Sequence, residues 1–162
     1  ELVAGNIIIS EVLPDPAKTS DDVGEWFEIF NNTSFAINLN GITFKVGSKA
    51  YNYSGDKVLN AQSYGYFGKD IQGGAGAIAY YGAALSLVNT SGGIQVYNSN
   101  LSTAVLLSEM TYSSSTSGAS LSLDPSKLTF DDAKQQSSWC TATQVFSTGD
   151  KGTPGLSNSA CN

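Results

Sequence analysis

The chain has 162 residues, with 8 basic and 14 acidic side chains and no histidine, giving a formal net charge of −6 at pH 7. Without histidine it cannot form a Ser-His-Asp triad, a Cys-His pair or a histidine-ligated zinc site. All the basic residues are lysines, so the bidentate donor that recognises phosphate or guanine is missing too. We therefore expect no nucleic-acid partner, because such binding needs cations against phosphates.

Length and hydrophobicity indicate one folded domain. Typical domains have about 100–150 residues, and 41% hydrophobic residues are enough for a buried core. No linker divides the sequence, so we predict one domain over residues 1–162. The long uncharged stretch Ile71–Ser108 is interrupted by glycines, and no apolar run of about 20 residues survives in it. We therefore predict no membrane span.

Period-two alternation predicts β-strands from the N-terminal end onward. The first strand is Ile7–Val12, and the second, Glu25–Phe30, places Trp26, Glu28 and Phe30 on one face. If these strands are neighbours, we expect Glu11 and Glu28 on one side of the sheet, with Glu25 on the face opposite to Glu28.

A turn and a hairpin are expected next. Asn31-Asn32 has turn-forming residues, and Phe35–Leu39 alternates as a strand. Asn40-Gly41 is a strong hairpin signal, so we expect Phe35–Leu39 to pair with the following strand, Ile42–Val46.

The rest of the chain continues the β pattern. Further strands are predicted at Ala50–Tyr53, Tyr64–Gly68, Ala77–Tyr81, Leu85–Val88, Gly93–Tyr97, Ala104–Tyr112 and Ala119–Leu123. In the last of these, Ser120 and Ser122 share one face. The only place for a helix is around Pro125–Gln136, and we expect one turn there at most. Strands at this spacing predict an all-β sandwich or barrel.

Cys140 and Cys161 are the only cysteines, too few for a structural zinc site. We expect a disulfide between them, which would stabilise the fold by roughly 3 kcal/mol; the alternative is two unpaired thiols. A disulfide indicates an oxidising compartment. We therefore expect a secreted, periplasmic or cell-surface protein.

Several motifs occur in a fixed order. Ile7–Val12 fits I-x-E-[VI], Gly24–Asn31 fits G-E-W-[VF]-E-[LI]-[YF]-N, and Trp139 with Gly152–Asn158 fits W…[ST]-P-G-x-x-N. Together they resemble the lamin tail domain family. Ile37–Phe44 is similar to that family's V-D-L-S-G-W-x-L, with isoleucine where tryptophan is usual. The motif residues are Glu11, Glu25, Trp26, Glu28, Asn31, Gly41, Trp139, Pro154, Gly155 and Asn158.

The resemblance implies an immunoglobulin-like β-sandwich with extra strands or loops, mostly within Tyr51–Leu85. It also implies the role of the exported bacterial members, which are non-catalytic accessory modules beside hydrolases. A departure occurs at Glu109–Tyr112, where bacterial members often show V-D-x-V-x-Y. The chromatin binding of the nuclear members is not expected here, because the chain lacks a basic surface.

Three groups of residues are candidate sites. Glu11 and Glu28 on adjacent strands could act as acid and base of a hydrolase, or could accept backbone N–H bonds that fix a loop such as Pro14–Gly24. Asp15, Asp21 and Asp22 offer oxygen ligands for calcium, although their spacing is not that of an EF-hand. The tyrosines could stack on sugars or anchor a protein partner; they are Tyr51, Tyr53, Tyr64, Tyr66, Tyr80, Tyr81, Tyr97 and Tyr112.

The reading that these features favour is a non-catalytic exported module for interaction, adhesion or an accessory role, with a protein partner or a cell-surface glycan. The alternatives are a carbohydrate- or calcium-binding β-sandwich module and, third, a carboxylate-based hydrolase. No catalytic residue and no obligatory cofactor are expected, with calcium the one candidate metal.

Overall fold

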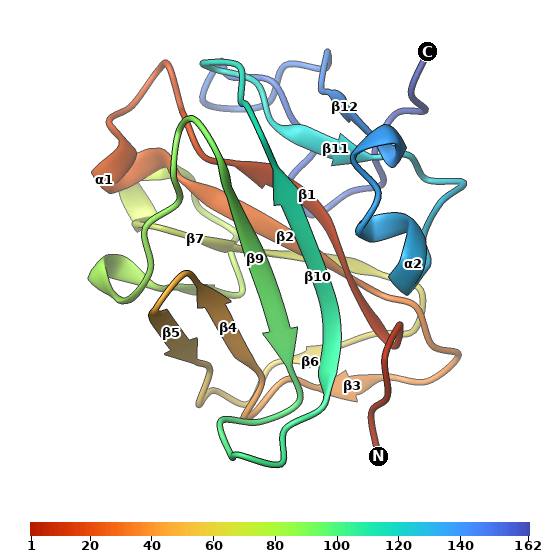
Figure 1. Ribbon diagram of the computed structural model, residues 1–162. Coiled ribbons are helices and arrows are strands. Elements are labelled where there is room, and N and C mark those ends of the chain that lie inside the picture. Colours follow the sequence, from red (N-terminus) through yellow and green to blue (C-terminus); the bar gives the residue numbers. More distant parts are fainter.

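The computed structural model describes residues 1–162 and consists of two β-sheets packed face to face (Figure 1). Strands make up 34% of the chain and helices 10%, and all helices are short. The all-β sandwich predicted from the sequence is confirmed. None of the helices has the length and apolar character needed to cross a membrane.

The six-stranded sheet has the N-terminal strands at its centre. In spatial order it contains β12 (Trp139–Thr141), β11 (Leu121–Leu123), β1 (Ile7–Leu13), β2 (Trp26–Asn31), β7 (Tyr64–Gly68) and β8 (Ala79–Tyr80). Neighbouring strands are antiparallel except β7 and β8, which are parallel. Every residue of β1 and β2 is buried, so both faces of the sheet are covered at its centre.

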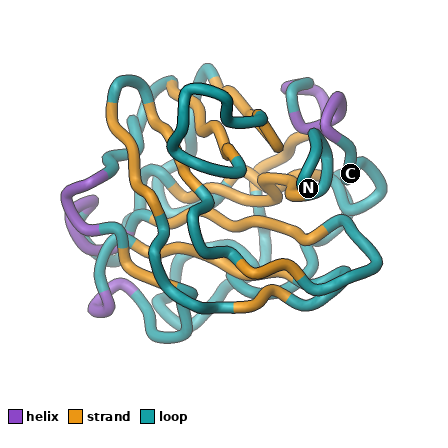
Figure 2. Tube along the Cα trace, turned by 90° about the horizontal axis from the view of Figure 1, so that it is seen from below, coloured by secondary structure: helices purple, strands orange, loops and turns teal.

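The second sheet has four strands, in the order β10 (Leu106–Tyr112), β9 (Gly92–Tyr97), β4 (Thr43–Val46) and β5 (Lys49–Asn52). A separate pair joins β3 (Ile37–Asn38) to β6 (Val58–Leu59). Single turns of helix lie outside the strands (Figure 2). They are α1 (Asp21–Gly24), α2 (Phe130–Ala133) and the 3₁₀ turns η1 (Ile71–Gly73), η2 (Gly82–Ala84) and η3 (Gln136–Ser138).

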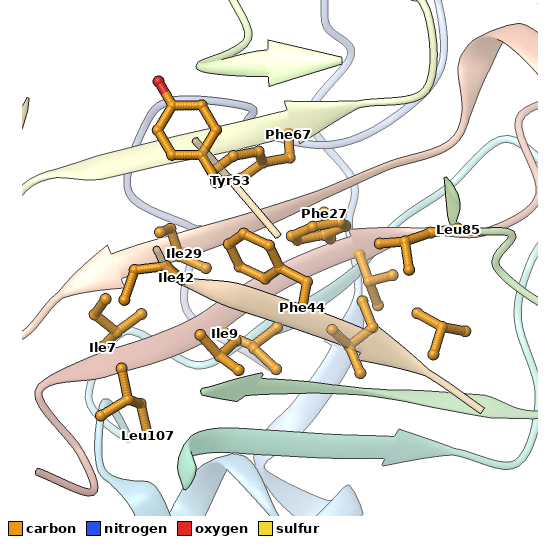
Figure 3. Close-up of a cluster of buried hydrophobic side chains, with 14 of the residues drawn as sticks. Ile7, Ile9, Phe27, Ile29, Ile42, Phe44, Tyr53, Phe67, Leu85 and Leu107 are labelled. Atoms are coloured by element: carbon orange, nitrogen blue, oxygen red, sulfur yellow. The ribbon is translucent and has the colours of Figure 1, made fainter. Parts of the chain in front are cut away.

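The main core fills the space between the two sheets and contains 21 buried residues. Phe27 and Ile29 of β2 lie across from Phe44 of β4 (Figure 3). The rings of Phe27, Phe44 and Phe67 lie with centroids 4.5–5.5 Å apart. Each such aromatic pair adds roughly 0.5–1.5 kcal/mol beyond its area burial. A second, smaller cluster lies on the other face of the six-stranded sheet, where Ala133 of α2 packs with Ile8 and Phe30.

The predicted hairpin at Asn40-Gly41 is wrong, although the turn is present. Gly41 has a positive φ of 86°, and the Gly41 N–H donates to Tyr53 O at 2.7 Å. The turn is therefore bound to the residue that follows β5, and β4 forms its hairpin with β5 through Gly47 and Ser48. The strand before the turn, β3, pairs with β6 instead.

The predicted strand Leu85–Val88 is also wrong, because side chains bind its backbone groups in place of a neighbouring strand. The short strands β6 and β12 are not among the predicted elements. The expectation of a helix only around Pro125–Gln136 is also wrong, because α1, η1 and η2 form single turns elsewhere. The strand Tyr64–Gly68 and the single helical turn within Pro125–Gln136 are as predicted.

Cys140 and Cys161 form a disulfide, with Cα atoms 5.7 Å apart and no free cysteine remaining. The predicted pairing is confirmed. The bond ties β12 to the C-terminal residues across 21 positions of sequence. A disulfide and the lack of a membrane-spanning helix are compatible with an extracellular protein.

Replacing both cysteines with serine should lower the free energy of unfolding by about 3 kcal/mol, because the unfolded chain regains the entropy that the closed loop removes. For a domain of this size, that corresponds to a drop of about 6–12 °C in Tm. Calorimetry of the double variant and the oxidised wild type measures the difference. An unchanged Tm would contradict a structural role for the bond.

Candidate functional site

A β-bulge in β1 brings two glutamates face to face. Ile9 pairs with Ile29, but the next pair is Glu11 with Glu28, so Ser10 is the extra residue. Strict alternation from Ile7 and Ile9 would have turned Glu11 into the core. The bulge shifts this phase by one residue. Val12 therefore faces the core, while Glu11 and Glu28 lie together on the opposite face, as predicted from the sequence.

The Glu11 carboxylate is surrounded by donors. Its oxygens accept hydrogen bonds from the hydroxyls of Ser120, Ser122 and Thr153. The backbone N–H of Thr153 also donates, at 3.1 Å from each oxygen. The predicted alternation in β11 is what places both serines toward Glu11. Five hydrogen bonds to one carboxylate favour its ionised form.

Glu28 has fewer donors. It accepts from the Ser10 hydroxyl at 2.7 Å and from the Gly155 N–H at 2.6 Å. The residues Gly152–Asn158, here called the C-terminal strap, thus bind both glutamates through backbone N–H groups. Asn158 fixes the far end of the strap, because its Nδ2 donates to Ser10 O at 2.7 Å and to Leu123 O at 2.8 Å.

Burial dominates the electrostatics of this carboxylate pair, since both side chains are 0% exposed. Loss of hydration raises the pKa of Glu11, and the Ser120, Ser122 and Thr153 donors lower it in part. Burial raises the pKa of Glu28 well above its usual 4.5, and the neighbouring Glu11 raises it further. We infer that Glu28, with fewer donors, is the member that holds a proton. The pair fixes the strap and has no contact with solvent.

An aromatic groove lies beside the strap, on the same side of the sheet. Its aromatic residues are Trp26 of β2, Tyr66 of β7 and Phe146. The Trp26 ring meets Tyr66 at 5.9 Å and Phe146 at 5.8 Å between centroids, both edge to face. The strap residues Gly152–Leu156 form one wall. A side chain at Gly152 would not fit, because its Cβ would lie 2.8 Å from Trp26.

The groove encloses about 380 Å³. The opposite wall is the glycine-rich segment 73–76, fixed by Tyr66, whose hydroxyl donates to Ala75 O at 2.9 Å. Val145 and Leu156 line it as well and are 60% and 62% exposed. The groove was not predicted, because its residues come from distant parts of the sequence.

Glu25 belongs to a different buried cluster, at the edge of the main core. Its carboxylate lies 3.3 Å from Lys69 Nζ and accepts the Leu87 N–H at 3.0 Å. Lys69 also donates to Leu85 O at 2.8 Å. Tyr112 donates to Val88 O at 2.7 Å, and burial raises the Tyr112 pKa to about 12. These side chains replace the strand partner expected for Leu85–Val88.

The other motif residues have structural contacts. Asn31 Nδ2 donates to Leu59 O at 3.0 Å and to Phe35 O at 2.9 Å, which joins β2 to the β3–β6 pair. Trp139 Nε1 donates to Ala133 O at 2.9 Å and so fixes α2. Pro154 lies in the strap wall of the groove.

The three predicted calcium ligands do not come together. Asp15 and Asp21 both accept from Asn89 Nδ2, at 3.4 and 2.9 Å, while Asp22 lies beside Lys49 and Lys69 at another depression. No group of three or more His, Cys, Asp or Glu side chains is placed to hold a metal ion.

The tyrosines do not form an exposed platform. Tyr53, Tyr81 and Tyr112 are buried and none of the others is fully exposed. Tyr66, in the groove, is the one that lies beside Trp26.

Sequence reasoning missed Thr153 and Lys69. A usable signal existed for Lys69, which is the only cation between Lys57 and Lys127. Thr153 lies within the strap, but nothing in the neighbouring residues distinguishes it from an exposed threonine. Compared with models of known protein families the chain matches none, and no curated protein matches its sequence. The geometry of the site therefore carries the functional argument.

Glu28→Gln should flatten the pH dependence of stability. Because the folded-state pKa of Glu28 lies above 4.5, its stabilising contribution is complete below about pH 4.5 and is lost as the pH rises toward that pKa. We expect the wild-type free energy of unfolding to fall over this window, and that of the variant to fall less. Urea unfolding from about pH 4 to about pH 8 measures both.

Glu11→Gln is the comparison variant for that experiment. Its amide would turn N–H groups toward the hydroxyl and backbone donors around Glu11, which should lower the free energy of unfolding by about 2 kcal/mol even at pH 4. Glu28→Gln keeps these bonds, so its effect at pH 4 should be smaller. An identical pH dependence in wild type and Glu28→Gln would contradict the assignment of the proton to Glu28.

Asn158→Asp should loosen the strap. The new carboxylate would face the Ser10 and Leu123 carbonyl oxygens that Asn158 now binds as a donor. This buried repulsion should lower the free energy of unfolding by about 3 kcal/mol. The exposed Asn100→Asp is the control and should change stability by less than about 0.5 kcal/mol. Equal effects of the two substitutions in urea unfolding would mean that Asn158 does not hold the strap.

Proposed function

We propose that this chain is a non-catalytic module of an exported protein and binds an extracellular partner at the aromatic groove. The observation that carries the proposal is that, on one face of the sheet, the carboxylates are buried while the neighbouring groove is accessible. The carboxylates that could serve as acid and base are 0% exposed and bonded to the strap. The accessible feature beside them is a depression lined by aromatic, aliphatic and uncharged polar residues.

The hydrolase alternative loses support from the same burial. A general acid or base must reach the substrate directly or through one water. Glu11 and Glu28 lie below Thr153 and Gly155, and their oxygens are occupied by protein donors. Opening the strap would expose them only by breaking the bonds that offset their burial.

The exposed apolar residues support an interaction surface. Val145 and Leu156 are two of the nine large hydrophobic side chains that are exposed, and both border the groove. Exposed apolar groups around a hollow are typical of binding sites.

The proposal includes membership of the lamin tail domain family. Its support is that the motif segments from the two ends of the chain bind one another: Thr153 donates to Glu11, and Gly155 donates to Glu28. Asn158 of the same motif donates to Ser10 O, next to Glu11. Because the N-terminal and C-terminal motifs bind one another, a single structural requirement explains why both occur in the same chain. The exported, accessory role follows from this resemblance and agrees with the disulfide.

Val145→Asp should abolish binding of the fluorescently labelled chain to the surface of the cells that export it, because it adds a charge to the rim of the groove. Val58→Asp is the matched control, since Val58 is 46% exposed and lies on β6 outside the groove. Flow cytometry measures the binding of all three proteins.

Equal binding of the two variants would show that the groove is not the interaction surface. Turnover of chromogenic ester, phosphoester, glycoside or peptide substrates that is lost in Glu28→Gln would contradict the non-catalytic role.

A further inference from the structure

We infer that the ligand of the aromatic groove is an uncharged carbohydrate. This inference rests on the proposed function, because it names the ligand class for the same groove. It depends on the uncharged lining, the fixed aromatic rings, the volume of the groove and the pairing of β7 on both sides.

The lining of the groove contains no charged side chain. Charged residues make up 14% of the chain, yet none of the 15 residues around the groove is Asp, Glu or Lys. Its polar side chains that remain open to a ligand are the amide of Gln144, the hydroxyl of Ser147 and, as an acceptor, the hydroxyl of Tyr66, whereas the Thr153 hydroxyl is bonded to Glu11. Such groups hydrogen-bond neutral hydroxyls but do not compensate an ionic ligand. The lining therefore matches a neutral, polyhydroxylated molecule.

The aromatic rings are held in place before any ligand arrives. The Tyr66 hydroxyl donates to Ala75 O, and its ring packs edge to face with Trp26. The Phe146 ring also packs edge to face with Trp26. Tyr66 and Phe146 are both half-buried, so each keeps some apolar surface to pack against the C–H face of a sugar. Fixed rings reduce the entropy lost on binding.

Trp26 supports the other two rings. It lines the groove but is only 2% exposed, and its Nε1 is itself buried and has no hydrogen-bond acceptor within the protein. Its ring meets those of Tyr66 and Phe146 edge to face, which holds both beside the groove. The volume of about 380 Å³ lies at the small end of ligand pockets, about 300–1,000 Å³.

An extended peptide is a weaker candidate, because it would need a free strand edge to pair with. Tyr66 lies on β7, which is bonded to β2 on one side and to β8 on the other. The groove therefore offers side chains and a loop to a ligand, but no unpaired strand backbone.

The test is a glycan array with neutral and acidic oligosaccharides, followed by calorimetric titration of the strongest neutral ligand. We expect neutral glycans to bind and Phe146→Ala to weaken binding about tenfold. Phe35→Ala is the matched control, since Phe35 is 55% exposed and lies outside the groove; its affinity should stay unchanged. In a Trp139→Phe background Trp26 is the one remaining tryptophan, and its fluorescence should change on binding.

No binding to any neutral glycan, equal affinity of Phe146→Ala and wild type, or no change in Trp26 fluorescence would overturn the inference. The proposed function fails separately. If binding to cells depends on Val145 but is lost after protease treatment and kept after periodate oxidation of glycans, the groove binds protein. The carbohydrate inference is then wrong, while the interaction module stands.

Discussion

Two carboxylates face each other across the central strands of this sandwich with no contact to water, and the remaining structure of that face follows from this arrangement. Like charges on directly opposed strand residues repel, and burial removes the hydration that would moderate the repulsion. The fold offsets this with hydroxyls from β11 and backbone N–H groups from the C-terminal strap. The C-terminal strap must therefore lie at a fixed position over β1 and β2.

The same constraint builds the groove. Its strap wall is the segment that binds Glu11 and Glu28, so the wall is rigid for reasons unrelated to any ligand. Gly152 lets this wall approach Trp26 closely, because a Cβ there would meet the indole at 2.8 Å. The disulfide secures the residues that follow the strap. Stability of the sheet face and shape of the groove are in this way properties of one hydrogen-bond network.

Local residue patterns predicted much of this sheet face, but they could not predict which distant segments pair. Alternation in Glu25–Phe30 and Ala119–Leu123 gave the correct faces for Glu28 and the two serines, and the cysteines gave the disulfide. The bulge at Ser10 has no signature in the residues around it, yet it decides which way Glu11 faces. The segment Leu85–Val88 has strand-like residues, but buried side chains bind its backbone. The glutamates were expected to fix the loop Pro14–Gly24; they fix the strap and, through Glu25, Leu85–Val88.

The most direct measurement is an NMR titration of the side-chain carboxyl carbons of Glu11 and Glu28 in the folded protein. We expect both groups to titrate above the ordinary glutamate range, with Glu28 retaining its proton to the higher pH. Titration of both groups near 4.5, the usual value for glutamate, would mean that water reaches them. The strap would then not cover the pair, and the account of this face would be wrong.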